Sequence, residues 1–237
     1  MTFLDHLLVL AFAILYPIYA YFAYRKIKAD LVADKPGIRV HDYKETTAWL
    51  WFLAIAALVA WKYQGRSLLD LGLGLPSAWP ALLGLLLIGL LSGFLAIQLR
   101  KLGGDEELRR GLGEQLDRGS VSEFLPRTRQ ELRWFILLSI TAGVCEEILF
   151  RGFLIWYFSQ FSATAVAVVL SAIVFGLAHS YQGWQGSLRA GVMGLVLAVS
   201  YVLTGSLWVP IFLHIAGDIY AGTLGWLAYA EDGPDPS

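Results

Sequence analysis

Seven apolar segments, each about as long as a membrane-crossing helix, dominate this chain. A helix needs about 20 apolar residues to cross the hydrocarbon core of a bilayer. The segments lie approximately at residues 3–24, 46–63, 78–99, 131–158, 162–179, 187–204 and 206–229. They predict an all-α fold, a polytopic transmembrane helical bundle of about seven helices.

The composition supports a membrane location. Of the 237 residues, 57% are hydrophobic and only 16% are charged, and the mean hydropathy is +0.59. A soluble domain of this size cannot bury so much apolar sequence, so we expect membrane lipid to cover the surface. The net charge of -1 argues against nucleic acid as a partner.

The basic residues predict the topology. Six of the 18 Lys and Arg residues lie between Arg25 and Lys44, and eight lie between Arg100 and Arg133. The loop after the second segment carries only Lys62 and Arg66 in addition. Since cytoplasmic loops are enriched in Lys and Arg, we expect the N-terminus outside and the C-terminus in the cytoplasm. We interpret the first segment as a retained helix, because no basic residue precedes it.

Three regions are expected. Residues 1–130 would hold the first three helices and a charged cytoplasmic loop in which an amphipathic helix could form. Residues 131–229 would form the core that carries the site, and 230–237 an acidic tail. Two sets of small residues predict close helix packing. They are Gly89 with Gly93, and Ala190 with Gly194 and Ala198.

Three ionisable residues interrupt the fourth apolar segment, in the stretch TAGVCEEILFRGF. Each charge at mid-helix opposes insertion by about 2.5 to 3.5 kcal/mol, so Glu146, Glu147 and Arg151 need partners or water. Glu147 and Arg151 are four residues apart and can form an ion pair. Glu146 has no such partner on its own helix, which makes it the candidate general base. The alternative is that all three residues form a buried ionic lock between helices.

Polar residues also occur in two later segments. His179 follows Phe175 by four residues near the end of the fifth segment, and His214 precedes Asp218 by four in the seventh. These intrusions predict one polar cavity lined by the fourth, fifth and seventh helices. Counting residues from the cytoplasmic side puts Glu146 near mid-membrane and His179 near the surface. The two helices must therefore be staggered, or these boundaries are wrong.

The motifs resemble those of a known family. EEILFR matches EExxxR, FGLAH matches FxxxH, and HIAGD matches the His-xxx-Asn/Asp motif of the CPBP intramembrane proteases. That family includes CAAX prenyl endopeptidases and proteins of bacteriocin processing and abortive infection. The resemblance covers about residues 131–223 and implies a hydrolase, an intramembrane endopeptidase that cleaves a peptide bond near the cytoplasmic face.

The resemblance also implies roles for the site residues. Glu146 and His179 would activate a water molecule, and Glu147 and Arg151 would shape the site. His214 and the residue four positions later would stabilise the oxyanion. That residue is Asp218 rather than asparagine here, so it would either donate a hydrogen bond when protonated or orient His214 when ionised.

Several rival interpretations remain open. Glu146, His179 and His214 could ligate zinc with a water in the fourth position, although no cofactor is the prediction. The single cysteine, Cys145, excludes an intrachain disulfide and is a poor nucleophile in apolar surroundings. Other classes are a proton-coupled membrane transporter and a noncatalytic bacteriocin-immunity or adaptor protein.

The predicted partners are membrane lipid and a peptide or protein substrate, which could be lipidated or membrane-anchored. A CAAX-type enzyme would process a prenylated C-terminus. The predicted location is the cell membrane of a prokaryote.

Overall fold

The computed structural model describes residues 1–117 and 122–229, and regular structure within these ranges is entirely helical. The elements are α1 Phe3–Val9, the π-helix η1 Leu10–Leu15, α2 Tyr16–Val32, α3 Ile38–Tyr63, α4 Ala78–Gly104, α5 Glu106–Asp117, the 3-10 helix η2 Ser122–Phe124, α6 Arg129–Glu146, the π-helix η3 Glu147–Leu154, α7 Ile155–Ser159, α8 Thr164–Ala178, the 3-10 helix η4 Ser180–Gln182, α9 Gly183–Thr204 and α10 Trp208–Tyr229. The predicted fold class, an all-α membrane bundle, is confirmed.

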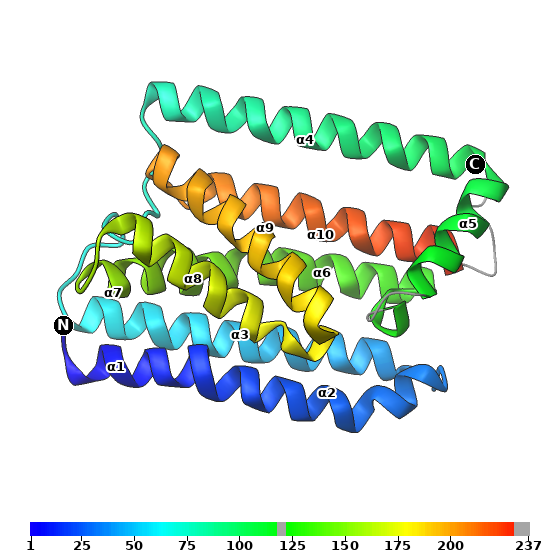
Figure 1. Cartoon of the computed structure of the whole chain (residues 1–237), viewed down its shortest axis with the longest axis horizontal. Coiled ribbons are helices and arrows are strands. Elements are labelled where there is room, and N and C mark those ends of the chain that lie inside the picture. The colour runs from blue at the N-terminus through cyan, green and yellow to red at the C-terminus, as the bar shows by residue number, and fades with distance from the viewer. Residues whose placement is uncertain (118–121, 230–237) are drawn as a thin grey trace.

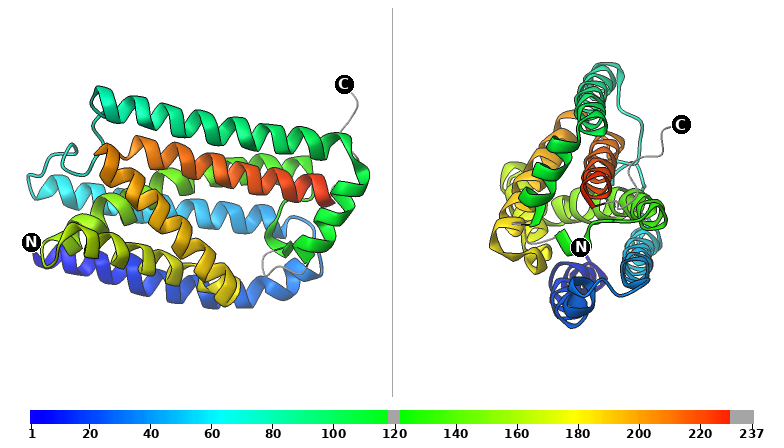
Figure 2. Two further views of the ribbon diagram at one scale, coloured as in Figure 1. Left: turned by 45° about the horizontal axis from the view of Figure 1, so that its top comes forward. Right: turned by 90° about the vertical axis from the view of Figure 1, so that its right-hand side faces the viewer.

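Seven helical passages run along the long axis of the described bundle (Figure 1). Five helices among the described residues are long and apolar enough to cross a membrane: Phe3–Val32, Ile38–Tyr63, Ala78–Gly104, Ser180–Thr204 and Trp208–Tyr229. The other two passages are α6 continued through η3 and α7, and the shorter helix α8. Seen along the axis, α6 and α10 lie between the α1–α3 side and α4 (Figure 2). The protein is therefore an integral membrane protein in which α6 and α10 are central.

Several helices extend beyond their predicted ends. The first passage continues to Val32 instead of ending at residue 24, and α3 begins at Ile38 instead of residue 46. The third continues to Gly104 instead of 99. Polar residues can prolong a helix outside the hydrocarbon core because the backbone hydrogen bonds continue there, so hydropathy marks the membrane and not the helix end.

The two basic regions lie at the same end of the bundle. Figure 1 shows the turn between α2 and α3 and the helix α5 at one end, and the α3–α4 connection at the other. The possible amphipathic helix is present as α5. Buried Arg39 holds this end together, since its Nε donates to the carbonyl oxygen of Glu123 over 2.8 Å and its guanidinium pairs with Asp34. The predicted acidic tail, residues 230–237, lies outside the described residues.

The capping residues of α6 explain where the long fourth passage begins. Thr128 Oγ1 accepts from the amide of Glu131 over 3.2 Å, and the Glu131 carboxylate accepts from the amide of Thr128 over 3.2 Å. This capping box satisfies amides that a helix start leaves unpaired. It fixes the helix that delivers both glutamates to the interior.

The hairpin of α8 and α9 is staggered against that long passage. The α8 helix has only 15 residues, whereas α6, η3 and α7 together run from Arg129 to Ser159. It therefore returns only part of the way, about 22 Å at 1.5 Å per residue. Gly183, with φ of 76°, lies where the chain reverses into α9. His179 at the end of α8 consequently reaches the level of Glu146, which resolves the predicted conflict in depth.

Glycines permit close packing of α8 on α9. A Cβ added to Gly176 would lie 2.8 Å from the carbonyl oxygen of Ser187 and 3.1 Å from the Cα of Gly191. The second predicted set of small residues also packs, since a Cβ on Gly194 would lie 3.0 Å from the Phe175 ring and Ala198 is fully buried. The prediction of close packing at the first set was wrong, because a Cβ on Gly89 or Gly93 would meet nothing within 4 Å.

Candidate active site

The adjacent glutamates lie where an α-helix becomes a π-helix. Glu146 is the last residue of α6, and Glu147 begins η3. A π-helix has wider turns than an α-helix, and such segments are frequent at functional sites. The two neighbouring side chains have different surroundings.

Glu147 is completely buried, and its two oxygens differ, since Oε1 is engaged twice and Oε2 makes no hydrogen bond to a described residue. Its Oε1 accepts from Nη1 of Arg151 over 2.8 Å and faces Nδ1 of His214 at 2.8 Å. Arg151 also donates from Nη2 to the carbonyl oxygen of Gly194 over 3.2 Å and lies over the ring of Phe175. The predicted pairing of Glu147 with Arg151 is confirmed, and it extends to α9 and α10.

His214 and Asp218 bring α10 to the glutamates. Nε2 of His214 lies 3.9 Å from Oε2 of Glu146 and 3.5 Å from Oδ2 of Asp218. The first separation is too long for a hydrogen bond and the second is at its limit. Since Nδ1 already meets Glu147, the imidazole of His214 is flanked by carboxylates at both nitrogens.

His179 is oriented by its own helix. Its Nδ1 lies 2.8 Å from the carbonyl oxygen of Phe175, and its ring stands 4.5 Å from the Phe175 ring. A carbonyl oxygen can only accept, so the neutral ring carries its hydrogen on Nδ1 and leaves Nε2 as an acceptor. This tautomer can take a proton from water or from a reacting group.

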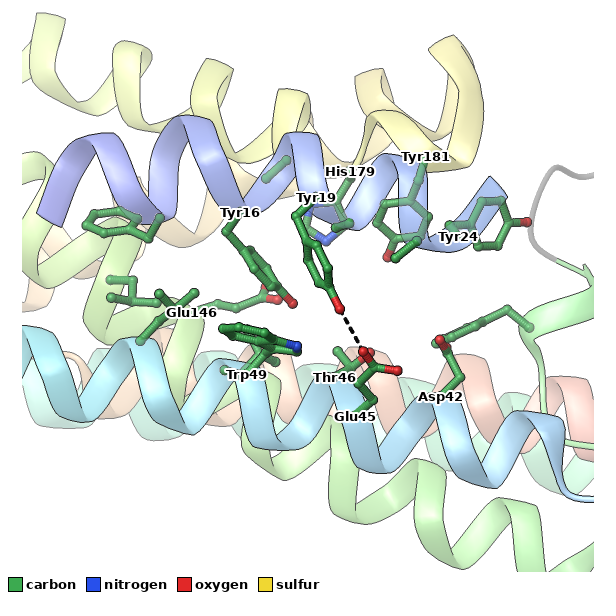
Figure 3. A pocket seen from close by; sticks show the side chains of 18 of the residues that line it. Tyr16, Tyr19, Tyr24, Asp42, Glu45, Thr46, Trp49, Glu146, His179 and Tyr181 are labelled. Atoms are coloured by element: carbon green, nitrogen blue, oxygen red, sulfur yellow. Dashed lines mark hydrogen bonds between the residues drawn. The ribbon is translucent and has the colours of Figure 1, made fainter. Parts of the chain in front are cut away.

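Glu146 and His179 line one cavity of about 120 Å³ (Figure 3). Oε2 of Glu146 is buried and makes no hydrogen bond to any described residue, and the nearest charged partner is Nε2 of His214 on α10 at 3.9 Å, so no partner from its own helix engages it. The prediction that the fourth and fifth helices line a common cavity is confirmed. The prediction that the seventh helix also lines it was wrong, since neither His214 nor Asp218 reaches the cavity wall. Nδ1 of His214 instead faces Glu147, and its Nε2 lies 3.9 Å from Glu146.

The first two passages supply most of the remaining wall. The lining polar and aromatic residues from these passages are Phe12, Tyr16, Tyr19, Tyr24, Asp42, Glu45, Thr46 and Trp49. Sequence reasoning treated the first three helices only as support and missed these residues. A signal was present, because Asp42, Glu45 and Trp49 recur at helical spacing on one face, as do Tyr16 and Tyr19.

The described residues do not form the zinc site weighed as an alternative. Among them no group of three or more His, Cys, Asp or Glu side chains is close enough to hold a metal ion. His214 directs Nδ1 to Glu147, and its Nε2 is 3.9 Å from Glu146. The prediction that the protein needs no cofactor stays a prediction.

Cys145 is unsuited to nucleophilic attack. It is fully buried in an apolar cluster with Tyr43, Leu50 and Phe135. It is absent from the cavity wall. A thiol in such surroundings resists ionisation, so its role is packing.

Fold and site together define a polytopic helical membrane protein with a buried glutamate and histidine site. Residues 128–220 match the family model described as Type II CAAX prenyl endopeptidase Rce1-like. This match contains all six predicted site residues and confirms the resemblance over that region.

A curated relative is similar over a shorter stretch. The protein described as "Putative membrane peptidase YdiL" of Bacillus subtilis (strain 168) is 31% identical over 80 residues, which is 34% of this chain and 32% of the relative. The chain thus spans about a third of the length of this relative. No solved structure matches.

Proposed function

We propose that this chain is an intramembrane endopeptidase in which Glu146 and His179 activate water. The observation that carries the proposal is the difference between the contacts of the two glutamates. Oε1 of Glu147 is engaged by both Arg151 and His214, whereas Glu146 makes no hydrogen bond to a described residue and lines the cavity that His179 also lines. The family match and the name of the curated relative both support peptide hydrolysis.

In the proposed reaction, Glu146 takes a proton from water, and the oxygen attacks the carbonyl carbon of the scissile peptide bond. The proton then passes to the leaving nitrogen as the carbon–nitrogen bond breaks. Nε2 of His179 holds the water, because its Nδ1 is engaged by Phe175. His214 and Asp218 do not line the cavity, so we propose a positioning role for them, with Nε2 of His214 at 3.9 Å from Oε2 of Glu146 and 3.5 Å from Oδ2 of Asp218.

Replacement of the base tests this function. Purified Glu146→Gln protein in detergent should retain its fold and lose peptide cleavage by about a hundredfold or more, the usual contribution of a general base. Glu106→Gln, an exposed change on α5, is the matched control. In cells, membrane proteomics should show a precursor accumulating with Glu146→Gln only. Unchanged cleavage by Glu146→Gln would contradict the proposal.

The description of the matched family directs the choice of substrate. We propose CAAX-type processing of a prenylated C-terminus as the first activity to test. A farnesylated C-terminal peptide should be cut and its unprenylated form left intact. Equal cleavage of both peptides would contradict dependence on the prenyl group while leaving the peptidase assignment in place.

We also propose that the end of the bundle carrying the α2–α3 turn and α5 faces the cytoplasm. The basic residues are concentrated there.

A further inference from the structure

The far end of the cavity is acidic, and Lys28 is not part of the lining but lies with Nζ 5.7 Å from the centroid of the Tyr24 ring. Asp42 and Glu45 from α3 line it together with Glu146, whereas no Lys or Arg is among the lining residues. Figure 3 shows Glu146 toward one end of the cavity and Asp42 toward the other. Three carboxylates in one partly enclosed space attract a positively charged group, because the surrounding protein screens charge less than water does.

The two outer carboxylates differ in how far they are already engaged. Glu45 accepts a hydrogen bond of 2.7 Å from the hydroxyl of Tyr19 and lies 3.8 Å from Nε2 of His41. Asp42 makes no hydrogen bond or ion pair with any described residue, although it is half-buried. Asp42 is therefore the less engaged of the two carboxylates.

Aromatic rings complete the same end. Tyr19 packs against Trp49 with ring centroids 5.3 Å apart, and Tyr24 packs against Tyr181 at the same separation. Figure 3 shows Tyr19, Tyr24 and Tyr181 on the side opposite Asp42 and Glu45. Aromatic faces bind cations and also the methylene stem of a long side chain. Rings facing carboxylates are the surroundings that a lysine or arginine side chain fits.

Positions along α3 give the distance between this end of the cavity and the carboxylate of Glu146. Cys145 and Leu149, which flank Glu146, pack in apolar clusters with Leu50 and Leu53 respectively. Asp42 precedes Leu50 by about two helical turns, or about 12 Å along the axis. An extended peptide covers about 3.3 Å per residue, so that separation corresponds to three or four residues of substrate.

We infer that Asp42 and Glu45 form a specificity subsite for a lysine or arginine side chain of the substrate, three or four residues from the bond cleaved. The inference rests on the proposed peptidase function, because the cation must belong to the molecule that reaches Glu146. The same cavity holds Glu146, whose Oε2 is buried and makes no hydrogen bond to a described residue, so a substrate bound at Asp42 and Glu45 has a direct path to the reacting carboxylate.

A peptide library tests the subsite. The probe is a lysate digested with a glutamate-specific protease, so that lysine and arginine lie inside the peptides, and cleavage by the detergent-purified full chain is mapped by mass spectrometry. The wild type should show lysine or arginine enriched at three or four residues from the cut. For a matched pair of basic and neutral peptides, Asp42→Asn with Glu45→Gln should lower the preference in kcat/KM about tenfold. Asp42→Lys should favour acidic peptides instead.

The controls separate the possible failures. Glu106→Gln with Glu107→Gln removes two exposed carboxylates from α5 and should leave the preference intact. Gel filtration checks that each variant is folded. Cleavage without a basic preference, or a preference that the α3 variants do not alter, would overturn the subsite alone. No cleavage beyond that of Glu146→Gln would contradict the proposed function, and the subsite with it.

Discussion

One oxygen of Glu147, Oε1, accepts from Arg151 and faces Nδ1 of His214, each at 2.8 Å. Because Arg151 also bonds the Gly194 carbonyl oxygen, this carboxylate links η3 to α9 and α10. The charge of Arg151 is buried, with 1% of its side chain exposed. Glu147 thus stabilises the site, and we assign the chemistry to its neighbour.

Removal of Glu147 should destabilise the protein more than removal of Glu146. Glu147→Ala leaves the buried guanidinium of Arg151 without its partner, a change that costs about 3–5 kcal/mol in comparable sites. We expect a clear fall in the melting temperature in detergent, measured by gel filtration after heating. Glu146→Ala should change that temperature little, since Oε2 of Glu146 has no hydrogen bond to lose. Equal losses for the two variants would show that Glu147 has no special structural role.

An added methyl group on Gly176 should disturb the site from a distance. Its Cβ would lie 2.8 Å from a backbone oxygen of α9, which cannot turn aside as a side chain can. Overpacking of this kind costs about 1–3 kcal/mol. Gly176→Ala should therefore lower the melting temperature and reduce cleavage, because His179 is three residues away. Gly89→Ala on α4 is the control that should be silent, and a silent Gly176→Ala would refute close packing of α8 on α9.

Cysteine labelling should locate the two ends of the bundle. Cys145 is fully buried and should not react, so single cysteines can be introduced into the natural sequence. A membrane-impermeant maleimide added to intact cells should label Asp70→Cys, in the loop after α3. It should label Glu107→Cys, on α5, only after the cells are permeabilised. The reverse pattern would invert the proposed orientation.

Chelators should leave cleavage unchanged. The described residues offer no cluster of three close metal ligands, and the proposed mechanism uses only Glu146 and His179 on water. Activity should be the same before and after dialysis against EDTA. Loss of activity that added zinc restores would contradict the mechanism and favour the zinc alternative.

Hydropathy predicted the fold, and residue spacing predicted the contacts between side chains of the same helix. Seven passages, the position of the basic loops and the Glu147–Arg151 pair all follow from local sequence rules. Helix ends were less accurate, because α2 and α3 continue into polar sequence that hydropathy excludes. The stagger of α8 depends on its 15-residue length and on the reversal at Gly183. Its effect on the depth of His179 follows only once α8 is packed against the other helices.

The cavity wall could not be derived from motifs. The motif residues all lie after residue 145, whereas Tyr19, Asp42 and Trp49 come from the first two passages. Their spacing shows that they share helix faces, but not which neighbour those faces meet. For the same reason, the sequence could not show that Nδ1 of His214 faces Glu147 or that His214 is absent from the cavity lining.

The π-helix η3 gives this site a dependence on chain length that substitutions would not reveal. Its wider turns accommodate one more residue than an α-helix would over the same rise. Deleting one residue between Glu147 and Arg151 would let the segment rewind as an α-helix and would change the four-residue spacing that pairs those two side chains. In such a shortened chain every side chain of the site could be retained while Glu147 and Arg151 no longer stood four residues apart. Variation in this segment is therefore constrained in the number of residues as well as in their identity.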